Sequence, residues 1–71
     1  MHNEFTAIVE RDGPLYIAYC AEVPGANGQG KSREECLANL RKAIGLILDY
    51  RREESLRGLP PDAEQELVVV G

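Results

Sequence analysis

The sequence is poor in the residue types that carry catalysis and disulfide bonding. Its 71 residues include no tryptophan, one histidine and two cysteines. The histidine, His2, lies in a chain terminus, where residues are seldom well ordered. Neither Cys20 nor Cys36 therefore has a predictable base beside it, which nucleophilic catalysis would need. We expect both to be small buried apolar residues, and we expect a reducing, cytoplasmic location because the chain shows no signal-like leader.

Basic residues are also few: eight Lys and Arg stand against twelve Asp and Glu, for a formal net charge of −4. Nucleic acids and membrane surfaces attract basic faces. We therefore expect the domain to bind neither DNA nor a membrane, and a basic protein is the favoured partner. No apolar run approaches the roughly 20 residues that a membrane span requires.

The chain is also too short for a large core, so we expect a single domain, residues 1–71. Chains of this size often gain stability from association, and we expect a homodimer, a higher homo-oligomer or a permanent partner. A metal-dependent nuclease would need clustered carboxylates. The best candidates are spread along the sequence, so we assign no catalytic residue, metal or cofactor: Glu10, Asp12, Glu22 and Asp49.

One amphipathic helix dominates what is present. Ser32 and Glu35 have the S-x-x-E spacing of a capping box, which predicts a helix from about Arg33 to Glu54. Steps of three and four between apolar residues give this helix a single apolar stripe. The stripe consists of Cys36, Leu37, Leu40, Ala43, Ile44, Ile47 and Leu48.

The flanking segments favour strands. Residues 4–10 and 15–20 alternate in the manner of strands, and the short turn at Arg11-Asp12-Gly13-Pro14 makes them an antiparallel pair. A short third strand is possible over 26–29, although its glycines weaken the prediction. The valine-rich run 66–70 predicts a last strand that is buried on both faces. We therefore expect an α+β fold: a small antiparallel sheet, order β-β-β-α-β, with one long helix on one face.

One helix covers only one face of such a sheet, so we expect the other face, or a sheet edge, to serve self-association or partner binding. The last helical turns, 50–54, are expected to overhang the sheet. Glu22 either faces a basic partner or is a solvated loop carboxylate. Asn39 either bridges the helix to a neighbouring loop or lies on the surface. Five residues are the candidate partner contacts: Ile8, Tyr16, Glu22, Tyr50 and Glu54.

Several motifs follow one another in order between residues 4 and 40: Phe5–Glu10, Asp12-Gly13, Tyr19–Gly25 and Gln29–Glu35, followed by Leu37 and Asn39. Together they resemble the N-terminal domain of HicB-type antitoxins, the inhibitor halves of type II toxin–antitoxin pairs. The chain departs from that pattern at Ala21, Ser32 and Cys36, where proline, threonine and alanine are more frequent. The first two changes keep turn and cap chemistry.

The resemblance implies a partial ribonuclease-H-like fold without a working nuclease site. It also implies binding to a small basic, HicA-like toxin that cleaves messenger RNA. Many members carry a further DNA-binding domain; because this chain ends at Gly71, direct promoter binding is not expected. Two alternatives stay open: an orphan interaction module that has lost its toxin, and a ribonuclease-H-like metal-dependent nuclease, which the scattered carboxylates disfavour.

Overall fold

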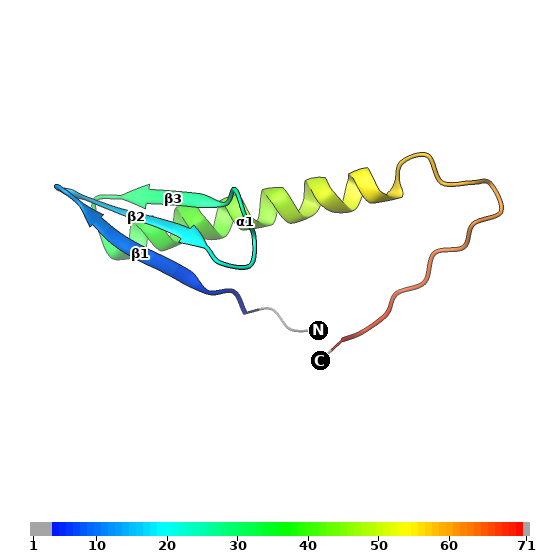
Figure 1. Ribbon diagram of the computed structural model, residues 1–71, viewed down its shortest axis with the longest axis horizontal. Coiled ribbons are helices and arrows are strands. Elements are labelled where there is room, and N and C mark those ends of the chain that lie inside the picture. The colour runs from blue at the N-terminus through cyan, green and yellow to red at the C-terminus, as the bar shows by residue number, and fades with distance from the viewer. Residues whose placement is uncertain (1–3, 71) are drawn as a thin grey trace.

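A three-stranded sheet and one long helix make up the regular structure of the protein. The computed structural model describes residues 4–70 (Figure 1). Its elements are β1 (Ala7–Asp12), β2 (Leu15–Cys20), β3 (Asn27–Gly30) and α1 (Arg33–Leu56). The strands are antiparallel in the order β1-β2-β3, and α1 lies against one face of the sheet. The predicted α+β class and the β-β-β-α order are confirmed, whereas the likeness to ribonuclease H stays a prediction.

The β1–β2 hairpin is set by its turn. Asp12 pairs with Leu15 and Ala7 with Cys20, so Gly13 and Pro14 alone form the loop. Gly13 has φ +60°, a conformation that most residues avoid and glycine adopts readily. The hairpin turn predicted at Asp12-Gly13 is therefore confirmed, although β1 begins and ends later than the predicted strand 4–10. The turn fixes which residues of the two strands lie opposite each other.

The glycines of β3 let the helix approach the sheet closely. A Cβ atom on Gly28 would lie 2.5 Å from the backbone nitrogen of Leu40, and one on Gly30 would lie 2.7 Å from that of Cys36. These glycines weakened the sequence prediction of a third strand, yet the strand forms. Here tertiary packing decides against intrinsic strand propensity.

The helix begins at the predicted cap and extends slightly further than predicted. Ser32 is the N-cap, and its hydroxyl accepts from the Glu35 N–H at 3.1 Å. The helix ends at Leu56 rather than Glu54, and Gly58, with φ +72°, takes the chain away from it. Figure 1 shows the last turns of α1 extending past the sheet, as expected for a helix of 24 residues.

The core is small and lies between α1 and the β2–β3 half of the sheet. α1 packs against β3 and β2 and makes little contact with β1. Both cysteines are free and buried, which confirms their predicted role as small apolar residues. The buried hydrophobic residues are Ala18, Cys20, Val23, Ala26, Cys36 and Leu40.

The prediction of a last strand over 66–70 is wrong. The structure has no strand there, and every residue from Glu66 to Val70 is exposed. The valine-rich composition favours extended backbone, but a strand also needs a neighbour for its N–H and C=O groups. α1 carries the chain beyond the sheet, and the segment returns without joining an edge (Figure 1).

No helix in the described part of the chain is long and apolar enough to cross a membrane.

Candidate protein-binding surface

The sheet face opposite α1 is the main candidate for binding a partner. Ala18 and Cys20 are buried on the helix side, so their neighbours along β2, Ile17 and Tyr19, point to the other side. Paired residues share a face, so the register assigns the rest. We call this surface the outer face; it consists of Ile8, Glu10, Asp12, Leu15, Ile17, Tyr19, Asn27 and Gln29.

The outer face combines an apolar centre with polar margins. Ile8 and Tyr19 lie directly opposite each other and are 38% and 41% exposed. Glu10 lies beside Ile8 along β1 on this face, and Asn27 lies beside Tyr19 across the sheet. An aromatic and aliphatic centre with a polar rim is the usual composition of a protein–protein contact.

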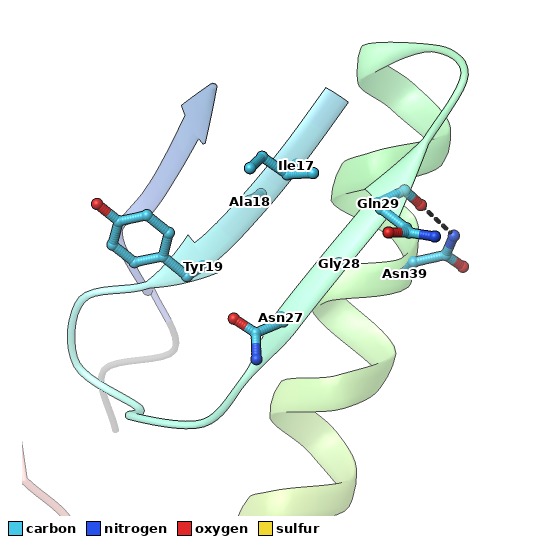
Figure 2. Close-up of a pocket in the computed structure, with 7 residues that line it drawn as sticks. All are labelled: Ile17, Ala18, Tyr19, Asn27, Gly28, Gln29 and Asn39. Atoms are coloured by element: carbon cyan, nitrogen blue, oxygen red, sulfur yellow. Dashed lines mark hydrogen bonds between the residues drawn. The ribbon is translucent and has the colours of Figure 1, made fainter. Parts of the chain in front are cut away.

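A shallow hollow of about 590 Å³ lies where the outer face meets the β3 edge (Figure 2). Tyr19, Asn27 and Gln29 contribute side chains to it. Asn39 reaches it from α1 and donates its amide N–H to the Gln29 carbonyl oxygen at 2.8 Å. Of the two roles left open for Asn39, the structure shows the bridge, although it reaches strand β3 rather than a loop. The bond occupies a backbone acceptor of an edge strand that would otherwise be open.

Glu22 is held within the chain rather than presented freely. Its carboxylate accepts from the Thr6 N–H and the Thr6 hydroxyl, each at 2.6 Å, and from the Cys20 thiol at 3.5 Å. These bonds, the Thr6 hydroxyl first, lower the pKa of Glu22 from 4.5 to about 2. The geometry gives Glu22 a fastening role between the start of β1 and the turn after β2, while its predicted contact with a partner stays a prediction.

Tyr16 lies on the opposite face from Ile8. It pairs with Arg11 and packs against the core on the helix side. The Arg11 guanidinium lies 4.6 Å from the centre of the Tyr16 ring and donates to its hydroxyl at 3.1 Å. Ile8 and Tyr16 therefore belong to different surfaces.

The remaining two predicted contacts lie on the helix overhang. Tyr50 is 63% exposed, and the Glu54 carboxylate pairs with Arg57 at 3.1 Å. Residues four apart share one side of a helix, so Tyr50 and Glu54 lie next to each other on the overhang. The five predicted contacts thus fall in four places rather than in one site.

Sequence reasoning missed the aromatic and amide part of the outer face, namely Tyr19, Asn27 and Gln29. A signal for Tyr19 was present: a loop of Gly13 and Pro14 alone sets Asp12 opposite Leu15 and therefore Ile8 opposite Tyr19. The amides depended on β3, whose glycines obscured it.

The described residues, 4–70, contain no group of three His, Cys, Asp or Glu side chains placed to hold a metal ion.

Two curated relatives are similar to the chain. The UPF0150 protein ssl0738 of Synechocystis sp. (strain ATCC 27184 / PCC 6803 / Kazusa) is 47% identical over 72 residues, which cover 99% of each chain. The chain belongs to the UPF0150 family. A UPF0150 protein of Helicobacter pylori (strain J99 / ATCC 700824) is 43% identical over 42 residues, 59% of this chain and 58% of its own. No protein-family model matches this UPF0150 chain, and no solved structure matches it significantly.

Proposed function

We propose that this UPF0150 protein is a HicB-like antitoxin that binds and masks a small basic toxin that cleaves messenger RNA. The observation that carries the proposal is the outer face, where Ile8 and Tyr19 lie opposite each other and are both exposed. The motifs of the HicB-type resemblance lie in the elements that build this face: β1, the end of β2, and β3 with the helix cap. Family membership supports the resemblance.

Inhibition is steric and electrostatic in this proposal. The chain carries a formal net charge of −4, and Glu10 and Asp12 place two carboxylates on the outer face. A toxin that binds RNA carries a basic surface, so opposite potentials speed encounter and orient the two proteins. The apolar centre around Tyr19 then supplies the close contact that covers the toxin's RNA-binding surface.

The protein contributes no chemistry in this proposal, and it acts in the cytoplasm, where messenger RNA is translated. A direct check is incubation of the purified protein with RNA and Mg²⁺. We expect no cleavage above that of a mock-purified sample. Cleavage that Asp12→Asn or Glu22→Gln abolishes would instead favour the nuclease alternative.

Co-expression with the basic protein encoded by an adjacent reading frame tests the function itself. We expect the two to co-purify and the UPF0150 protein to restore growth that the neighbour alone arrests. Tyr19→Arg, which places a like charge at the centre of the contact, should abolish both effects in a chain that stays folded by circular dichroism. If the wild-type pair neither co-purifies nor interacts in the growth assay, the antitoxin proposal is wrong and an orphan interaction module is favoured.

A further inference from the structure

The outer edge of β1 is the open edge of the sheet. β1 is the first strand in the order β1-β2-β3, and α1 covers the β3 side instead. The Thr6 carbonyl oxygen accepts from the Ala21 N–H, so the backbone polar groups of Thr6 point toward the β2 side. Because these groups alternate in direction along a strand, the N–H and C=O groups of Ala7 and Val9 point away from β2. At the β3 edge, by contrast, Asn39 occupies the Gln29 carbonyl. An edge with free backbone groups is a template for another strand.

An apolar groove of about 460 Å³ runs beside this open edge, between β1 and α1. Gly45 lies in it, and a Cβ atom built on Gly45 would meet nothing within 4 Å. Glycine in a helix interior lowers stability by about 1 kcal/mol relative to alanine. At Gly45 the absent side chain leaves space in the groove. The other main lining residues are Phe5, Ala7, Leu37, Ile44, Leu48 and the basic Arg41.

The chain also contains an exposed segment suited to this groove. Leu67 to Val70 are four consecutive apolar residues, three of them β-branched, with Leu67 90% and Val69 81% exposed. Single exposed apolar residues are ordinary, but a run of four is not. Glu64 and Glu66 precede the run, and Arg41 at the groove has no carboxylate partner among the residues that the structure describes. The segment and the groove are therefore complementary in both hydrophobicity and charge.

We propose that the segment Glu66–Val70 of one copy adds as a strand to β1 of a second copy, reciprocally, and fills the groove beside Gly45. Two four-stranded sheets result, and each copy supplies the strand that the other lacks. The alternating side chains of the segment enter the groove, while its backbone pairs with the outward groups of β1.

The path of the chain favours a second copy over the segment's own β1. Leu67 lines a hollow with Leu56 and Leu59 at the end of the helix overhang, and the turn there is closed by the Ala63 N–H bonding to the Pro60 carbonyl at 3.0 Å. From Leu67 to Val70 the chain spans at most about 10 Å. In Figure 1 the segment turns back along α1 without reaching the sheet. The overhang thus holds the start of the segment beyond the end of its own sheet, and β1 of a second copy is the proposed partner.

Two variants remove opposite halves of this contact without touching the buried core. Gly45→Leu fills the groove from open space with a residue that favours helix. Val68→Asp combined with Val69→Asp puts charge on both faces of a segment that is already exposed. Leu46→Gln is the matched control, because Leu46 is the next residue of the helix, is 71% exposed and does not line the groove. The readout is molar mass by light scattering over a dilution series, with circular dichroism to confirm folding.

We expect a dimer for wild type and Leu46→Gln, and a dimer dissociation constant raised by about 100-fold or more in each of the other variants. Mixing the Gly45→Leu and Val68→Asp/Val69→Asp chains should restore a dimer, since one intact tail then meets one intact groove. A monomeric wild type, or a dimer that survives both variants, would overturn the proposal. A monomer whose residues 66–70 are protected from hydrogen exchange, and lose protection in Gly45→Leu, would place the segment on its own β1 and overturn it equally. None of these measurements involves a toxin, so they stand apart from the antitoxin test.

Discussion

Glu22 holds Thr6 by two atoms at once, since its carboxylate accepts both the backbone N–H and the hydroxyl at 2.6 Å. Thr6 immediately precedes β1, and Glu22 lies in the turn that follows β2. The pair therefore closes the open end of the hairpin, opposite the Gly13 turn. The Glu22 carboxylate therefore stabilises the fold itself, and its charge should matter for stability.

Stability should fall at acid pH as Glu22 is protonated. Its pKa is 4.5 ordinarily and about 2 in the folded chain, so the charged form favours folding above about pH 4.5, and this contribution is lost as the pH falls toward 2. We expect Glu22→Gln to be less stable than wild type at pH 7, with a gap in unfolding midpoint that closes between pH 4.5 and 2. Urea unfolding at a series of pH values measures this. Glu10→Gln makes the same change in charge on the outer face and is the control; a gap that stays constant with pH would contradict the assignment.

Gly28→Ala should destabilise the protein by about 1–3 kcal/mol, because the new Cβ would lie 2.5 Å from the Leu40 backbone nitrogen. Neither strand nor helix backbone can move aside cheaply there. Gly45→Ala is the matched control, since its Cβ would meet nothing within 4 Å, and it should stabilise the helix by about 1 kcal/mol. Urea unfolding at concentrations where the chain is monomeric measures both. Equal effects of the two substitutions would show that close helix approach is not the reason for Gly28.

Ser32→Ala should cost about 1 kcal/mol of stability, because the hydroxyl that accepts the Glu35 N–H at 3.1 Å is lost and that N–H is left without a side-chain partner. Ser32→Thr keeps the acceptor and should remain within a few tenths of a kcal/mol of wild type. Thermal unfolding followed at 222 nm, where helix dominates the signal, compares the three chains. If the alanine variant were as stable as the threonine variant, the Ser32 cap would not be the reason that α1 begins at Arg33.

Features that depend on local chemistry could be predicted from the sequence. The S-x-x-E spacing located the start of α1, and Asp12-Gly13 located the hairpin turn, because both act within four residues. β3 was ambiguous because Gly28 weakens a strand in isolation and is needed only once the helix lies against it. The strand expected over 66–70 does not form for a related reason. Its residues favour extended backbone, but the chain after α1 does not run alongside the open edge of β1.

The candidate binding surface was harder to predict from the sequence than the fold. Ile8 was placed among the candidate contacts, and it lies on the outer face. Tyr16 is a candidate contact as well, but it pairs with Arg11 and packs on the helix side instead. Glu22 is fastened by a residue 16 positions earlier, a contact that no local pattern indicates.

Tyr19→Ala should weaken binding of the proposed toxin partner by about tenfold or more, whereas Tyr50→Ala should leave that binding unchanged. The two residues suit a direct comparison because both are exposed tyrosines, Tyr19 at 41% on the outer face and Tyr50 at 63% on the helix overhang. Titration of the adjacent-gene protein by calorimetry measures both affinities, and circular dichroism confirms that each variant keeps its helix. If only Tyr50→Ala lost affinity, the contact would lie on the overhang beside Glu54, and the outer face would not bind this partner. Ile8→Ala, directly opposite Tyr19 in the register, should share the loss if the outer face is the contact.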